Sequence, residues 1–231
     1  MSASPGGGQE HPLTYVTIDR MRVDHVSYAA EYDGLQATAE RLSKLIGVEP
    51  VDGGVHPRFG TRNVILPLAD RHYVEVVEVL DHPASDKAPF GQAVRARSEA
   101  GGGWLGWVVA VDDLSAAEKR LGREAVDGNR HRPDGIELRW KQIGINGLIA
   151  DPQVPYFIQW EDLSVHPANG STSQVHIGDL QIAGDPARVR EWLGVDQTFH
   201  KGDIHFTFVA PHGTPGLLSV TFQTPDGSVT I

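Results

Sequence analysis

The pattern of apolar and polar positions over residues 22–80 first alternates, then repeats every three to four residues, and then alternates again. Alternation is typical of a strand, and the longer repeat is typical of an amphipathic helix. Gly47 follows the helical repeat as a helix stop, and the pair Gly53-Gly54 predicts a turn. The segment predicts one βαβββ unit, with a strand over 22–29, a helix over 35–46 and strands over 63–68 and 73–80.

The same element order recurs twice further along the chain, which indicates an internal repeat. We expect a flexible tail over 1–20, a paired domain over 21–162 and a third, degenerate unit over 163–231. The second copy has predicted strands over 104–111, 136–143 and 155–160 and a helix over 113–122, after a connector over 81–103 that holds a short helix. The third copy has predicted strands over 175–182, 203–210 and 217–224 and a helix over 185–194.

His25 lies in the middle of the first predicted strand, and Glu75 lies in the middle of the last strand of the same copy. The other residues on the face of Glu75 are mostly apolar. A carboxylate on such a face is costly unless it has a metal, a charged partner or hydrogen bonds. His25 and Glu75 are therefore the candidate catalytic or metal-ligating pair. The structural alternative for Glu75 is an ion pair with Arg62 or Arg139.

A second group of candidates lies in a Gly- and Pro-rich stretch and among the tryptophans. His56, Arg58 and Asn63 would suit the rim of a pocket for an anionic or carbonyl-bearing molecule. Turn chemistry explains the same residues equally well. Four of the five tryptophans fall in the second copy. Most of them are expected in the core, and Trp107 and Trp140 are the candidates for lining a cup.

Composition narrows the class of protein but not its reaction. An apolar fraction of 40% and a charged fraction of 22% over 231 residues describe a globular protein. The net charge of −10 argues against a nucleic-acid partner, and the lack of cysteine excludes disulfide and thiolate chemistry. No apolar run approaches the ~20 residues that span a bilayer, and the N-terminus has no signal-peptide pattern. We expect a cytoplasmic protein with no membrane partner.

Several runs of residues carry a resemblance to a known superfamily. The runs DHV (24–26), GVHPRFGTRN (54–63) and YVEVV (73–77) are similar to glyoxalase-like domain proteins, and RPDG (132–135) and FIQW (157–160) extend the similarity. These proteins belong to the vicinal oxygen chelate superfamily, with glyoxalase I, extradiol dioxygenases and bleomycin-resistance-type binding proteins. The resemblance implies an α+β fold, in which repeated βαβββ units form curved mixed sheets around a cup for a small organic molecule.

The resemblance also implies a divalent metal, such as zinc, nickel, manganese or iron, held by His and Glu from two units. In the first copy His25 and Glu75 fit this pattern. In the second copy Gly106 and Gln159 take the corresponding positions. Gln159 would offer one neutral oxygen, a weak ligand, and a catalytic site usually has three protein ligands. We therefore expect weak or absent metal binding.

Three functional hypotheses remain open from the sequence. The first is a metal-dependent lyase, isomerase or dioxygenase acting on a carbonyl or vicinal-oxygen substrate at His25 and Glu75. An imidazolium–carboxylate pair would also serve as an acid/base site without a metal. The second is a non-catalytic protein that sequesters a small molecule, as resistance-type relatives do. The third is an interaction module, in which residues 163–231 cover the sheet or form a homodimer.

Overall fold

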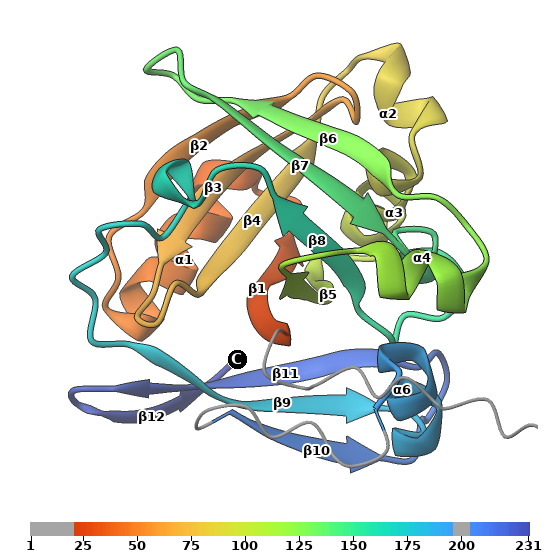
Figure 1. Cartoon of the computed structure of the whole chain (residues 1–231). Coiled ribbons are helices and arrows are strands. Elements are labelled where there is room, and N and C mark those ends of the chain that lie inside the picture. Colours follow the sequence, from red (N-terminus) through yellow and green to blue (C-terminus); the bar gives the residue numbers. More distant parts are fainter. Residues whose placement is uncertain (1–20, 196–203) are drawn as a thin grey trace, which may run out of the picture.

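Eight strands of the two N-terminal units close into a barrel (Figure 1). The structure is a computed structural model that describes residues 21–195 and 204–231, and the tail expected over 1–20 lies outside these residues. The first unit contains β1 (Met21–Ala29), α1 (Leu35–Ile46), β2 (Val51–His56), β3 (Thr61–Pro67) and β4 (Tyr73–Val79). The second contains β5 (Gly103–Val111), α4 (Ser115–Leu121), β6 (Val126–His131), β7 (Glu137–Ile143), α5 (Gly147–Ala150) and β8 (Tyr156–Trp160). Helices α2 (Pro83–Lys87) and α3 (Pro89–Glu99) connect the units.

The two units have matching strand orders, which confirms the predicted α+β fold of paired βαβββ units. The barrel runs β1-β4-β3-β2-β6-β7-β8-β5. In each unit the first strand pairs in parallel with the last, β1 with β4 and β5 with β8. The units join through antiparallel pairing of β1 with β5 and of β2 with β6. This arrangement places the middles of β1 and β4 side by side, as a shared site for His25 and Glu75 requires.

The pair Gly53-Gly54 lies within β2, so the turn predicted there is wrong. The register between β2 and β3 shifts between Asp52 and Gly54, which marks a bulge. Gly54 has a φ of 99°, and a Cβ there would collide with the carbonyl oxygen of His131 on β6. Glycine at this position therefore permits the close approach of β2 to β6 that closes the barrel.

The C-terminal residues form a separate four-stranded sheet with one helix, beneath the barrel in Figure 1. Among the described residues its elements follow the order βαβββ, and its strand order is β10-β9-β11-β12, so the first strand lies inside the sheet. None of its strands enters the barrel. The elements are a 3₁₀ turn (Leu163–Val165), β9 (His176–Ala183), α6 (Pro186–Leu193), β10 (His205–Val209), β11 (Gly216–Thr224) and β12 (Gly227–Thr230).

Aromatic side chains on the outer face of β5 pack against this second sheet. The Trp107 ring lies 5.3 Å from the Phe206 ring, and the Trp104 ring lies 6.3 Å from that of Phe222, between centroids. The indole of Trp104 also donates a hydrogen bond to the backbone carbonyl of Ile231 at 2.7 Å. The main hydrophobic core therefore runs between barrel and sheet. Within residues 21–195 and 204–231, no helix has the length and apolar character needed to cross a membrane.

Candidate active site inside the barrel

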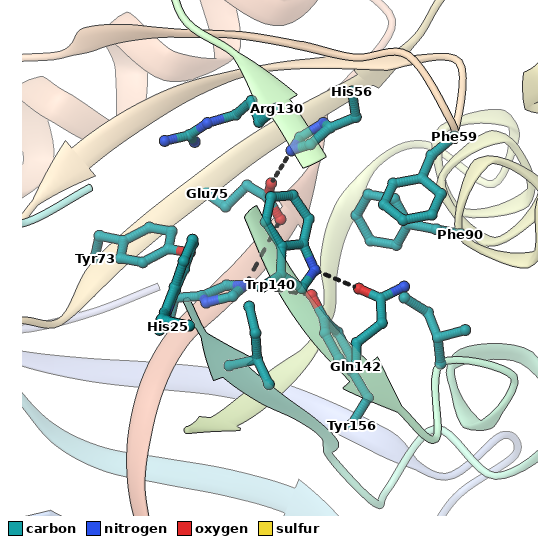
Figure 2. A pocket seen from close by; sticks show the side chains of 13 residues that line it. His25, His56, Phe59, Tyr73, Glu75, Phe90, Arg130, Trp140, Gln142 and Tyr156 are labelled. Carbon is teal, nitrogen blue, oxygen red and sulfur yellow. Dashed lines mark hydrogen bonds and ion pairs between the residues drawn. The ribbon is translucent and has the colours of Figure 1, made fainter. Parts of the chain in front are cut away.

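A pocket inside the barrel holds the chemistry-bearing side chains (Figure 2). The cavity has a volume of about 20 Å³. It is therefore a narrow slot rather than a wide cup. The lining residues are His25, His56, Phe59, Tyr73, Glu75, Phe90, Arg130, Trp140, Gln142, Ile145, Tyr156, Ile158 and Trp160.

The Glu75 carboxylate on β4 is the centre of the pocket's hydrogen-bond network. Ser27 donates to Oε2 at 2.9 Å, and the side-chain amide of Asn63 donates to Oε1 at 2.7 Å. Nε2 of His25 lies 3.8 Å from Oε2, and Nε2 of His56 lies 3.6 Å from Oε1. Both carboxylate oxygens therefore have a fixed donor and an adjacent imidazole.

This network keeps Glu75 ionised although it is only 4% exposed. Burial alone would raise the pKa of Glu75, but His25, His56 and the hydrogen bonds from Asn63 and Ser27 outweigh it and lower the pKa below its usual range. Burial lowers the pKa of His56 to about 4, so this imidazole is neutral at pH 7. The two hydrogen bonds stabilise the carboxylate whatever the charge on the imidazoles. The result is an ionised carboxylate beside the neutral imidazole of His56.

A buried aspartate fixes the orientation of His25. Oδ2 of Asp24 lies 2.9 Å from Nδ1 of His25, and Asp24 is fully buried. Although burial opposes it, hydrogen bonds from His166 and His25 and the charge of Arg22 hold the pKa of Asp24 far below its ordinary value. An ionised Asp24 requires the proton of His25 on Nδ1. Nε2 of His25 then faces the pocket, 3.3 Å from the hydroxyl of Tyr156.

The neighbouring residues Asp24 and His25 are both buried because β1 contains a bulge. In a regular strand, adjacent side chains point to opposite faces. Opposite β5, the register shifts between Val23 and His25, which leaves Asp24 as an extra residue. The local distortion brings the carboxylate alongside the imidazole that follows it in the sequence.

Two buried tyrosines flank His25 and retain their protons. The Tyr73 ring stacks on the His25 ring at 4.4 Å between centroids. Burial, followed by the negative charges of Glu75 and Asp24, raises the pKa of Tyr73 and of Tyr156 well above the ordinary value. The Tyr156 hydroxyl is therefore a hydrogen-bond donor that faces the slot at neutral pH.

The opposite wall of the pocket is aromatic. The rings of Phe59, Phe90 and Trp140 surround His56 at centroid distances of 5.9 to 6.2 Å. The indole N–H of Trp140 donates to Oε1 of Gln142 at 2.7 Å. This wall excludes water from one side of the slot and strengthens the electrostatic interactions inside it.

Comparison with known proteins places this barrel in a family. The sequence profile described as "Glyoxalase-like domain" matches residues 23–197, more than half of the chain. The chain belongs to the glyoxalase-like domain family. This family is part of the vicinal oxygen chelate superfamily, as the resemblance predicted. No curated protein matches the chain in sequence.

Several solved structures are similar to this glyoxalase-like protein at low identity. A hypothetical protein from Staphylococcus aureus aligns over 87% of this chain and 90% of its own, with 17% identity and a TM-score of 0.65. A methylmalonyl-CoA epimerase from Mycobacterium tuberculosis aligns over 60% of this chain and 85% of its own, with 15% identity and a TM-score of 0.40. A methylmalonyl-CoA epimerase in complex with methylmalonyl-CoA and NH4+ aligns over 64% and 98%, with 17% identity and a TM-score of 0.42. At this identity the first likeness shows the fold alone.

The structure brings five of the sequence-predicted site residues together. His25, His56, Glu75 and Trp140 line the slot, and Asn63 holds Glu75. The structural alternative for Glu75 was wrong, because the guanidinium of Arg62 pairs with Glu78 at 2.7 Å and that of Arg139 pairs with Glu137 at 2.7 Å.

Three other predicted residues lie elsewhere. Arg58 is exposed, and its guanidinium lies 3.5 Å from the backbone carbonyl of residue 127. Trp107 points outward into the core beneath the barrel. Oε1 of Gln159 accepts a hydrogen bond from the backbone N–H of Leu114 at 3.0 Å, next to the start of α4, because strand alternation turns it away from the pocket.

The strand register also corrects the comparison between the two units. His25 pairs with Tyr73 in the first unit, and Val108 pairs with Tyr156 in the second. Aligning Tyr156 with Tyr73 places Val108 at the position of His25 and Ile158 at that of Glu75. Because the two units share this register, Gly106 and Gln159 do not together correspond to His25 and Glu75. The second unit presents apolar side chains there.

The superfamily implies a divalent metal, and the donor set does not fit one. Both oxygens of Glu75 already accept hydrogen bonds, and Arg130 adds a buried positive charge to the same pocket. The second unit contributes Val108 and Ile158 instead of ligands. In the described parts of the chain, no three His, Asp or Glu side chains are grouped to hold an ion.

Several residues of the pocket and its surroundings had no usable signal in the sequence. Arg130 and Gln142 lie on β6 and β7, and β6 was not predicted at all. Tyr156 and Trp160 looked like ordinary strand residues at the end of the second unit. Asp24 was hidden by the apparent alternation of β1. Their common signal is polarity at positions that the barrel buries, which becomes visible only with the strand pairing.

Proposed function

We propose that this protein binds a small carbonyl compound in the barrel slot and transfers a proton at the carbon next to the carbonyl. The observation that carries the proposal is the buried, ionised carboxylate of Glu75, fixed by two hydrogen bonds and flanked by His25 and His56. Such a base, held in a site that excludes water, is suited to proton abstraction from carbon. The reaction class is an isomerase or a lyase.

Each side chain has a distinct part in this reaction. Glu75 takes the proton from carbon, and negative charge develops on the carbonyl oxygen. The hydroxyl of Tyr156 lies in the same slot and would stabilise that charge. Return of the proton to the same or a neighbouring carbon gives isomerisation. Loss of a β-substituent from the enolate gives a lyase reaction.

The test is hydrogen–deuterium exchange on carbon, followed by proton NMR in deuterium oxide. A panel of small ketones, aldehydes and oxo acids is incubated with the wild-type protein, with Glu75→Gln and with Glu78→Gln. Glu78 is the matched control because it lies on the same strand and pairs with Arg62. The proposal expects exchange that Glu75→Gln abolishes and Glu78→Gln leaves intact. Equal exchange in wild type and Glu75→Gln would contradict it.

The second candidate function is sequestration of a small molecule without chemistry. Its support is the aromatic wall formed by Phe59, Phe90 and Trp140, together with the apolar Ile145 and Ile158 of the second unit. The same NMR samples distinguish the two candidates. Binding of a panel compound without exchange in the wild type favours sequestration over proton transfer.

A further inference from the structure

Arg130 on β6 is a buried cation with few partners. It is 3% exposed, and its Nη1 lies 3.5 Å from Oδ1 of Asn63. Its Nε has no hydrogen-bond partner. A guanidinium has five N–H donors, and leaving them unpaired in the interior costs free energy. The fold therefore retains an unfavourable group inside the pocket, which is a common property of ligand-binding positions.

The one carboxylate of the pocket does not neutralise Arg130 directly. The amide of Asn63 donates to Glu75 with its nitrogen and faces Arg130 with its oxygen, so it separates the two charges. Across the described residues, Arg130 forms no ion pair within 4.0 Å, whereas the exposed Arg132 pairs with Asp134. Figure 2 shows the Arg130 side chain on the Tyr73 side of the pocket. An anionic group entering the slot would supply the missing partner.

Gln142 on β7 provides a second unpaired donor in the same pocket. It is 2% exposed, and its Nε2 has no partner. Its orientation follows from the Trp140 indole, which donates to Oε1 and leaves the amide nitrogen as the free end. Figure 2 places Gln142 across the pocket from Arg130, with Glu75 between them. The slot therefore has a cationic end, a neutral donor end and a base in the middle.

We infer that the ligand is a short oxo carboxylic acid, with its carboxylate on Arg130 and its ketone oxygen toward Gln142. The guanidinium fork matches a carboxylate in geometry and charge, and the amide N–H matches a neutral carbonyl oxygen. In a 3-oxo acid such as acetoacetate, the carbon between these groups would then lie beside Glu75. The small volume of the slot limits the ligand to a compact chain. The inference rests on the proposed site for its location, but not on the occurrence of proton transfer.

The experiment compares acids with their methyl esters by ligand-observed NMR titration. The probes are 2-oxobutyrate and acetoacetate, each against its methyl ester, which keeps the ketone and removes the charge. The variants are Arg130→Met and Gln142→Leu, with Arg132→Met as the control on the loop that follows β6. Circular dichroism and thermal unfolding verify that each variant is folded. Arg130→Lys keeps the charge without the fork, and we expect it to retain part of the preference.

The expected result is that at least one acid binds wild type about 10- to 100-fold more tightly than its ester, the range given by charge-assisted hydrogen bonds. Arg130→Met should bring the ratio close to one, Arg132→Met should keep it, and Gln142→Leu should weaken acid and ester alike. An acid-to-ester ratio near one in wild type, an unchanged ratio in folded Arg130→Met, or no binding of either acid at about 10 mM would overturn the inference.

The outcome is separable from that of the proposed function. An acid preference that depends on Arg130, without any exchange on carbon, would reject proton transfer and support this ligand class. Glu75-dependent exchange of neutral ketones, without an acid preference, would reject the ligand class and support proton transfer.

Discussion

At Glu75, hydrogen bonds and nearby imidazoles offset the free-energy cost of burying a carboxylate. Ser27 and Asn63 each donate to one oxygen, and two imidazoles lie within 3.8 Å. Sequence alternation was sufficient to find Glu75 and His25, because a charged residue on an apolar strand face is conspicuous without any alignment. The partners of Glu75 were not predictable from the same pattern. Asn63 and His56 reach it only through the pairing of β2 with β3 and of β3 with β4.

The first prediction concerns metal affinity. We expect zinc, nickel, manganese and iron(II) to bind no more tightly than micromolar, because the carboxylate oxygens are already engaged and the second unit supplies no ligands. Isothermal titration of chelator-treated protein measures this. Stoichiometric, submicromolar metal binding that is lost in both His25→Ala and Glu75→Ala would contradict the prediction and favour the metalloenzyme hypothesis.

The second prediction concerns acid stability. Burial lowers the pKa of His56 and of His72 from 6.5 to about 4 in the folded protein. The unfolded chain therefore binds protons first as pH falls, so the free energy of unfolding decreases from about pH 6.5 to about pH 4. The loss is on the order of a few kcal/mol per histidine. Denaturant titrations at pH 7 and pH 5 measure it.

Two matched variants test whether buried histidines cause this pH dependence of stability. His56→Gln should remove part of the slope between pH 7 and pH 5, and the exposed His131→Gln should leave it unchanged. Identical free energies of unfolding at the two pH values in wild type would show that burial does not keep these histidines neutral.

At the scale of elements, irregularities in the strands determine which residues reach the pocket. The bulge in β1 places Asp24 beside His25, and the bulge in β2 allows the contact with β6 that introduces Arg130. The longer helices and most strands were predictable because their periods span many residues. Bulges were not, since a single extra residue depends on the register of the partner strand. The pair Gly53-Gly54 is an example: its sequence predicts a turn, but it lies inside strand β2.

The third prediction tests the role of Asp24 as a positioning residue. In Asp24→Asn the side chain keeps its shape but loses the charge that fixes the proton of His25 on Nδ1. We expect proton exchange on carbon to slow by at least about tenfold and its pH profile to shift, with a fold retained by circular dichroism. Asp179→Asn on β9 is the control outside the barrel. An unchanged rate and pH profile would assign Asp24 to stability alone.

At the scale of the whole molecule, the barrel holds the pocket and the C-terminal sheet supports it from below (Figure 1). Trp107 is fully buried at their junction, on the opposite face of β5 from the pocket. The three-copy element order was predictable from the sequence. The different strand order of the third copy could not be predicted. It depends on which strands pair with β9, and the hydrophobic period of a strand does not determine its partners.

The fourth prediction separates this supporting layer from the site. Trp107→Ala should lower the free energy of unfolding by about 3–5 kcal/mol, the usual range for removing a buried aromatic side chain. Ligand binding by the folded fraction should change little, since Trp107 does not line the slot. Chemical denaturation and NMR titration on the same preparation measure both quantities. A selective loss of binding at unchanged stability would place Trp107 in the site instead.

The most direct test of the central claim is the initial rate of proton exchange on carbon, measured in deuterium oxide with a metal chelator in excess. Wild type, Glu75→Gln and Glu78→Gln are compared on the panel compound that exchanges fastest. The structure predicts that the wild-type rate survives the chelator and that Glu78→Gln matches it. It also predicts that Glu75→Gln loses at least about 100-fold, as expected when a general base is removed. A wild-type rate that the chelator abolishes, or that Glu75→Gln leaves intact, would contradict the assignment of Glu75 as the base.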